Sequence, residues 1–149
     1  MAKGYGSIAR GLLNGTDALA RAPGWLWNAD LRVFRQVLDL SDTAVAKVDA
    51  DFNVLFVKPR GTIISKIEVI SSVSLTTSQL SFGPEASPAK YGALKAYGTT
   101  ANAIVSWAVA TTFDDDLATA AETIGMTIDV ADLPGAGIVI VDFHVLSPG

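Results

Sequence analysis

The back half of the chain, from about residue 40 to residue 146, alternates apolar, β-branched positions with polar ones and is broken by short turns. In the run over residues 62–73, for example, Lys66 and Glu68 fall between isoleucine and valine positions. A period of two residues is typical of a strand that buries one of its faces. The pattern predicts strands over residues 52–57, 62–73, 74–82, 101–110, 122–130 and 137–146, and a loop or single helical turn over residues 88–97.

Residues that favour turns separate these apolar runs. They include Pro59-Arg60-Gly61, Gly83-Pro84, the three aspartates at 114–116 and Leu133-Pro134-Gly135. No helix long enough for a βαβ crossover is predicted between the strands, so we expect antiparallel sheets. About six or seven short strands at this spacing are typical of a mainly β protein, here an antiparallel β-sandwich or jelly-roll-like domain over residues 40–149.

Residues 1–39 differ from the rest of the chain in their pattern. Ile8 and Leu12 fall at helical spacing, but Gly11 and Gly15 interrupt the segment. Each interior glycine weakens a helix by about 1 kcal/mol relative to alanine. We therefore predict an extended, partly helical N-terminal arm that is ordered mainly by contacts with another surface.

Trp25 and Trp27 lie close together near the end of this arm. A large aromatic side chain buries about 150–250 Å² when it packs, so we do not expect two of them to remain in water. They pack either on the chain's own β-domain or in a neighbouring subunit, because tryptophan and arginine are enriched among the residues that contribute most to binding.

The formal net charge of −4 is unevenly distributed. Residues 1–36 carry five basic and two acidic side chains, whereas the remainder carries six basic and thirteen acidic ones. An acidic body argues against a nucleic-acid surface there, so nucleic acid is not an expected partner. The basic charges of the arm are better explained by an acidic protein partner or simply by solubility.

The chain is more apolar than most soluble monomers. Half of its residues are hydrophobic and its mean hydropathy is +0.38. Its longest apolar stretches are far shorter than the roughly 20 residues of a membrane helix, and no signal peptide is evident. We expect no membrane association, and we expect the surplus apolar surface to be buried between subunits.

The residue types needed for metal or nucleophilic chemistry are scarce. The sequence contains no cysteine, which excludes disulfides, thiolate metal sites and cysteine nucleophiles. Its single histidine, His144, lies between Phe143 and Val145, so alternation turns it to the opposite face, toward solvent or an interface. The aspartates at 114–116 lack the ligand spacing of a calcium loop and are better explained as a solvated turn. We predict neither a metal nor a cofactor.

A catalytic role is also disfavoured by the motifs. No Gly-x-Ser-x-Gly elbow, P-loop or dinucleotide fingerprint is present. Asp129 and Asp132 are the most eligible carboxylates for acid–base chemistry, since such pairs are set by the fold and not by sequence spacing. We predict that the chain is not an enzyme, with a small hydrolase as the disfavoured alternative.

Three turn and strand motifs support a family resemblance. Residues 56–64 read Phe-Val-Lys-Pro-Arg-Gly-Thr-Ile-Ile, a Leu-Ser-Phe-Gly strand end at residues 80–83 precedes a loop with Tyr91 and Tyr97, and Leu-Pro-Gly-Ala-Gly at residues 133–137 leads into the last strand. With these motifs, residues 40–146 resemble small β-sandwich structural proteins of tailed bacteriophages. These are the decoration or cement proteins of the capsid and related head or fibre domains, and the resemblance leaves the arm unmatched.

The resemblance implies a non-enzymatic virion protein that is made in the host cytoplasm and sits on the capsid surface. It further implies a trimer at local symmetry axes, with the major capsid protein as its partner and the arm reaching across neighbouring subunits. The expected arm anchors are Trp25, Trp27, Phe34 and Arg35, with Arg21 and Arg32 pairing with acidic capsid surface.

An alternative from another class is a glycan- or receptor-binding module of a head fibre or tail. β-Sandwiches bind glycans through exposed aromatic rings, and Tyr91 and Tyr97 are the candidates for facing such a ligand. Trp107 lies in an apolar strand, so we expect it to belong to the core.

Overall fold

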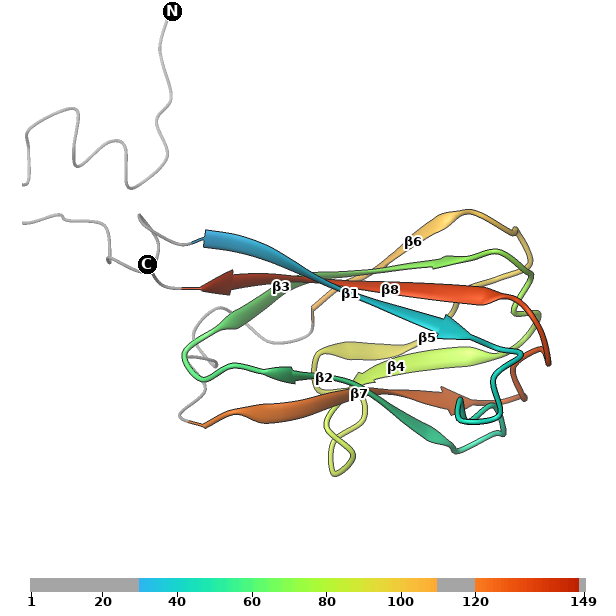
Figure 1. Cartoon of the computed structure of the whole chain (residues 1–149), viewed down its shortest axis with the longest axis horizontal. Helices are drawn as coiled ribbons and strands as arrows, with labels where there is room; N and C mark the ends of the chain where they lie inside the picture. The colour runs from blue at the N-terminus through green and yellow to red at the C-terminus, as the bar shows by residue number, and fades with distance from the viewer. Residues whose placement is uncertain (1–29, 110–119, 148–149) are drawn as a thin grey trace, which may run out of the picture. The chain divides into compact units, whose positions relative to one another are not determined.

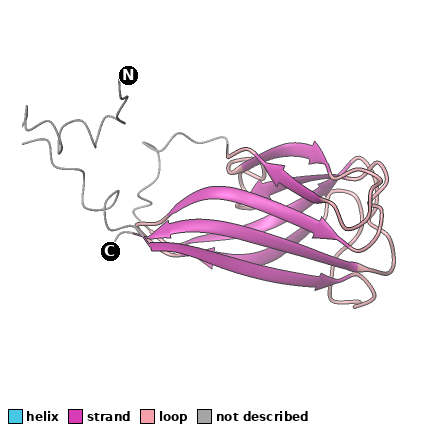
Figure 2. Cartoon of the chain, turned by 90° about the horizontal axis from the view of Figure 1, so that it is seen from above, coloured by secondary structure: helices cyan, strands magenta, loops and turns pink. Residues whose placement is uncertain are grey.

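The computed structural model describes residues 30–109 and 120–147 of the chain. These residues form eight strands in two four-stranded sheets (Figure 1). The strands are β1 (Asp30–Asp39), β2 (Phe52–Lys58), β3 (Ile63–Ser71), β4 (Gln79–Gly83), β5 (Gly92–Ala96), β6 (Ile104–Trp107), β7 (Glu122–Asp129) and β8 (Ile138–Ser147). Figure 2 shows the strands running side by side, with loops gathered at their ends.

The first sheet has the strand order β1-β8-β3-β6 and the second has the order β2-β7-β4-β5. β3 pairs antiparallel with β6 and β8, while β4 pairs antiparallel with β5 and β7. β2 is antiparallel to β7, and Figure 1 shows β1 running opposite to β8. The expected mainly β protein with antiparallel sheets is therefore confirmed. Within the described ranges, no helix is long and apolar enough to cross a membrane.

The core lies between the sheets and is rich in aromatic contacts. The ring of Phe143 in β8 lies 4.6 Å from that of Phe56 and 5.8 Å from that of Phe82, measured between centroids. Trp107 meets Phe82 edge-on at 5.3 Å, and its Nε1 donates a hydrogen bond of 3.1 Å to the carbonyl of Leu80. Trp107 is buried, so its expected place in the core is confirmed.

Strand β1 corrects the expected start of the β-domain. The first sheet includes Asp30–Asp39, ten residues that the sequence analysis placed in the arm. Phe34 and Leu38 face inward and pack against the core, and the Phe34 ring stacks 5.2 Å from that of Phe56. This packing makes β1 part of the sandwich. The expected extended or helical conformation of the arm falls on residues 1–29, which lie outside the described residues.

Strand β5 is a second correction, because a loop or helical turn was expected over residues 88–97. The side chains of Ala93, Leu94, Lys95 and Ala96 are all exposed, so β5 shows no alternation of buried and exposed positions. Backbone pairing with β4 forms this strand, without burial of one face. The strand expected from residue 74 begins only at Gln79, because the Ser78 amide closes a turn on the Leu75 carbonyl.

Candidate interaction surface

The outward side chains of the first sheet form the candidate interaction surface. Ile70 of β3 lies opposite Ile140 of β8 on one side and opposite Ile104 of β6 on the other. Val69 and Val141, their immediate neighbours in sequence, are fully buried, so Ile70 and Ile140 point to the outer side of the sheet. Ile104 is 64% exposed. Three β-branched side chains therefore stand in line on the outside.

Two contacts extend this line onto β1. The Leu40 amide donates a hydrogen bond of 2.8 Å to the Gly137 carbonyl, and the Arg35 guanidinium binds the Asp142 carboxylate. From the first pair to the second, the chain moves back five residues along β1 and forward five along β8, as expected for one antiparallel register. The same register places Val37 beside Ile140. Val37 is 58% exposed. The resulting aliphatic row crosses all four strands as Val37, Ile140, Ile70 and Ile104.

Further aliphatic side chains lie on the same side of the sheet, one next to this row on β8 and three beyond the ion pair of Arg35 with Asp142. Leu31, Val33 and Ile138 are exposed and Leu146 is half-buried. Single exposed apolar residues are common on proteins, but apolar side chains gathered on one face mark a contact surface. The aliphatic face is defined here as Leu31, Val33, Val37, Ile70, Ile104, Ile138, Ile140 and Leu146.

Paired charges cross the aliphatic face. Arg35 donates from Nε and Nη2 to the two carboxylate oxygens of Asp142 at 2.8 and 2.7 Å, and these bonds hold the pKa of Asp142 below its usual value. Glu68 lies 2.5 Å from Nζ of Lys66 and 3.1 Å from Nε2 of His144. The bond from Lys66 and, after it, the one from His144 lower the pKa of Glu68 despite its partial burial. Asp142 and Glu68 therefore each have a cation within the sheet.

The structure describes three of the six expected anchor residues. Arg35 lies on the outer side of β1, Arg32 is exposed, and Phe34 faces the core. His144 is partly exposed on the side opposite buried Phe143, as its position in the sequence predicted. The other expected anchors, Trp25, Trp27 and Arg21, lie outside the described residues.

Tyr91 and Tyr97 do not face a ligand, which corrects the sequence-based expectation. They are only 1% and 6% exposed. The Tyr97 hydroxyl donates to the Ala103 carbonyl at 2.6 Å and accepts from the Ser71 amide at 3.1 Å. The Tyr91 hydroxyl donates to the Glu122 carboxylate at 2.5 Å. Both rings thus pack in the core while their polar ends are satisfied inside, a common arrangement for tyrosine.

A polar cluster around Glu122 was not predicted from the sequence. Lys58 is fully buried opposite Glu122 in the β2–β7 register, and its Nζ lies 3.2 Å from the Tyr91 hydroxyl. Lys90 approaches the two carboxylate oxygens of Glu122 at 2.9 and 3.2 Å. Burial opposes ionisation of Glu122, but hydrogen bonds from Tyr91 and Lys90 outweigh it and lower its pKa. The cluster connects β2 and β7 with the residues that lead into β5.

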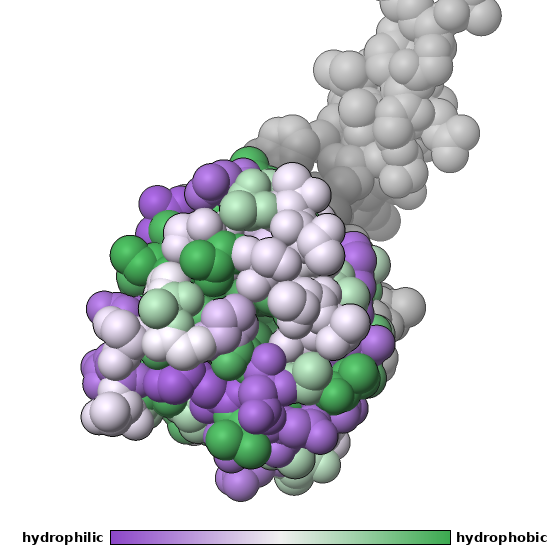
Figure 3. Space-filling model, turned by 90° about the vertical axis from the view of Figure 1, so that its right-hand side faces the viewer, coloured by the Kyte–Doolittle hydropathy of each residue, from purple (hydrophilic) through white to green (hydrophobic). Residues whose placement is uncertain are grey.

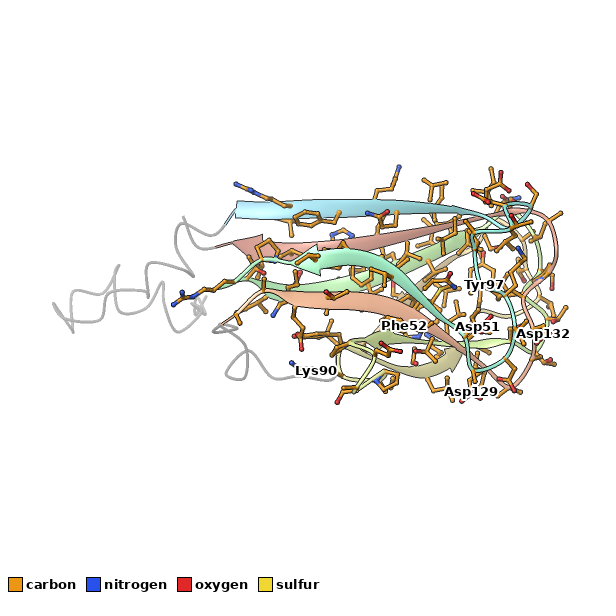
Figure 4. All side chains as sticks on the ribbon, turned by 60° about the horizontal axis from the view of Figure 1, so that its bottom comes forward. Asp51, Phe52, Lys90, Tyr97, Asp129 and Asp132 are labelled. Atoms are coloured by element: carbon orange, nitrogen blue, oxygen red, sulfur yellow. The ribbon has the colours of Figure 1, made fainter. Side chains whose placement is uncertain are left out.

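Asp129 and Asp132, the expected candidates for acid–base chemistry, accept hydrogen bonds from backbone amides of loops. Asp51, Asp129 and Asp132 lie toward one end of the sandwich (Figure 4). The Asp132 carboxylate accepts from the Asp49 amide at 2.8 Å, and that of Asp129 accepts from the adjacent backbone amide at 2.8 Å. Figure 3 views this end, where hydrophilic and hydrophobic side chains are mixed.

Residues 30–109 and 120–147 contain no group of three or more metal-ligating side chains. The expected solvated turn at aspartates 114–116 lies outside these ranges.

Comparison with known proteins identifies the fold. A chain of the capsid asymmetric unit of cyanophage Pam1 aligns over 90% of this chain and 96% of its own length, with a TM-score of 0.57 and 18% identity. A chain of the capsid of Ralstonia phage GP4 aligns over 81% of this chain and 85% of its own, with a TM-score of 0.58 and 16% identity. No protein-family model and no curated protein matches the sequence. The resemblance to capsid β-sandwich proteins is therefore confirmed in the fold, which this chain shares with capsid chains of two phages.

Proposed function

We propose that this chain is a structural protein of a phage virion that binds the capsid shell and stabilises it, as a decoration or cement protein. The observation that carries the proposal is the fold shared with the cyanophage Pam1 capsid chain over nearly the full length of both. Because almost all of each chain aligns, the two have similar lengths, which favours a small capsid component. The strand order also supports the jelly-roll assignment, since jelly rolls place eight strands in two such sheets and recur in viral capsids.

The aliphatic face supplies a physical route to shell binding. Covering apolar surface releases water and contributes roughly 25 cal/mol per Å², and a specific interface commonly buries about 1,200–2,000 Å² in total. The charges of Arg35 and Asp142, and those of Lys66 and Glu68, are already paired within the sheet, so covering either pair leaves each ion with its counter-ion. The proposed partner is the major capsid protein, and the proposed assembly is a trimer at local symmetry axes. Symmetry then repeats each contact over the shell.

Copy number in purified particles tests this function. Quantitative mass spectrometry of particles from the source is expected to find this chain at a ratio near that of the major shell protein. A handful of copies per particle would instead indicate a vertex, neck or fibre component, and absence from the particle would overturn the virion assignment.

The role of the arm in anchoring is part of the same proposal. Deletion of residues 1–29 leaves all ten residues of β1 in place, so we expect the sandwich to keep its melting temperature. The same deletion is expected to abolish binding to shells that lack this protein, because it removes Trp25, Trp27 and Arg21. Unchanged shell binding by the shortened chain would rule out an anchoring arm.

A further inference from the structure

The four edge strands of the two sheets differ in how they are protected from pairing with other chains. β6 spans only four residues, and short edge strands offer few free backbone groups. The register of β2 shifts between Val54 and Phe56, and the register of β5 shifts opposite residues 80–82. Such irregularities bend a strand and disrupt its hydrogen-bonding edge. Three of the four edges therefore carry a feature that discourages pairing.

Strand β1 lacks these protections. It spans ten residues without a proline, and its offset against β8 is the same at Arg35 as at Leu40. The Leu40 amide points to β8, so the even-numbered residues of β1 direct their backbone groups to β8 and the odd-numbered ones direct theirs to the open side. Val33, Arg35 and Val37 thus present amides and carbonyls at an edge that no strand of the described ranges covers.

We propose that β1 pairs antiparallel with β1 of a second copy of this chain, with Val37 on the two-fold axis. In this register Arg35 of each copy lies opposite Asp39 of the other, and both side chains belong to the outer side of the sheet. Opposite charges facing each other across strands stabilise the pair, whereas a register centred on Arg35 would set two guanidinium groups against each other. The positions of Arg35 and Asp39 therefore favour a second copy of this chain as the partner of β1, and they favour the register centred on Val37.

Arg35 and Asp39 each have hydrogen-bonding groups left for this contact. Asp39 accepts from the amide and hydroxyl of Ser41 through Oδ1, which leaves Oδ2 for the second copy. Arg35 uses Nε and Nη2 for Asp142, and a guanidinium has five N–H donors. The Arg35 side chain is 59% exposed.

Pairing would join two first sheets into one continuous sheet of eight strands. The aliphatic faces of both copies would then lie on the same side, which doubles the surface offered to a partner. The contact does not depend on the proposed function, because it needs no shell. Trimers held together elsewhere on their surface would be linked in pairs by it.

Thiol cross-linking of the purified full-length chain tests the pairing. The sequence has no cysteine, so Val37→Cys introduces a unique thiol. Residues facing each other in a hydrogen-bonded antiparallel pair have Cα atoms about 5.5 Å apart, within reach of a short bis-maleimide. In the same register the two copies of Val33 lie about 27 Å apart, since eight residues separate them along the strand. Val33→Cys and Ile104→Cys, the latter on β6, are the matched controls.

We expect covalent dimers from Val37→Cys and none from either control, at equal protein concentration and with equal melting temperatures. Adding Asp39→Arg to Val37→Cys should slow dimer formation several-fold, because it replaces attraction to Arg35 by repulsion. A Val37→Cys protein that stays monomeric, or equal cross-linking of all three single variants, would overturn the proposal. Cross-linking does not require the shell, so its outcome is independent of the outcome of the shell-binding tests.

Discussion

The two outer faces of the sandwich differ in what they offer to a partner. The first sheet presents the eight side chains of the aliphatic face and a set of internally paired charges. The second sheet presents Thr123 and Thr127 of β7, and Ser81 of β4 lies opposite Thr127. Its exposed apolar side chains on this side include Val54 and Val57 of the edge strand β2. Gly125, between the two threonines, leaves room for the Phe52 ring, which a Cβ at that position would overlap. Both sheets use the same alternation, but among the described residues only the first carries an aliphatic row that crosses all four of its strands.

The largest expected effect contrasts the two sides of strand β8. Phe143→Ala removes a buried ring that contacts Phe56 and Phe82, and such a truncation typically costs about 3–5 kcal/mol of folding free energy. Ile138→Ala, at an exposed position on the outer side of the same strand, should cost no more than about 0.5 kcal/mol. Urea denaturation of both variants measures the difference. Similar losses for the two variants would show that the outer side of β8 is not a free surface.

The sequence predicted which residues of β8 face the core, but it did not predict the aliphatic face. Period-two alternation correctly separated Lys66 and Glu68 from their buried neighbours in β3, and it turned His144 away from Phe143. Ile138 and Ile140 resemble core residues in sequence, because isoleucine is as apolar on the outside of a sheet as it is in the core. Only the register of neighbouring strands shows that they lie outside.

Two strands were missed for related reasons. In β1 the apolar residues occupy both faces, with Val33 and Val37 exposed and Phe34 and Leu38 directed to the core, so no alternation is visible. In β5 nearly every side chain is exposed. Likewise, the burial of Tyr91 and Tyr97 depends on hydroxyl partners distant in the chain, which the sequence does not bring together.

An intermediate effect is expected on the second face. Gly125→Ala places a methyl group against Phe52 and the Asn53 carbonyl, and overpacking of this kind typically costs about 1–3 kcal/mol. Gly135→Ala is the matched control, because a Cβ there meets nothing within 4 Å. Thermal melts of the two variants should differ by several degrees. Equal melting temperatures would contradict the close packing of Phe52 over Gly125.

A smaller effect is expected from acid on the paired charges of the aliphatic face. Arg35 lowers the pKa of Asp142 and Lys66 lowers that of Glu68, so both carboxylates favour the folded state above their unfolded pKa values, near 4. This stabilisation is lost as the pH falls through the lower folded values. We expect the urea midpoint to fall between about pH 5 and pH 2, and Asp142→Asn to make that fall shallower. Parallel pH profiles for the two proteins would exclude a contribution from Asp142.

Binding of single-site variants to shells that lack this protein tests the central claim, that the chain binds the shell through the aliphatic face. Ile104→Asp puts a charge into the aliphatic row at a position that is 64% exposed, so it should spare folding. Thr123→Asp puts the same charge on the outer side of the second sheet. We predict that Ile104→Asp raises the Kd at least about tenfold, equivalent to about 1.4 kcal/mol, while Thr123→Asp leaves it within a factor of about two. Equal affinities of the two variants, or a greater loss with Thr123→Asp, would contradict the account.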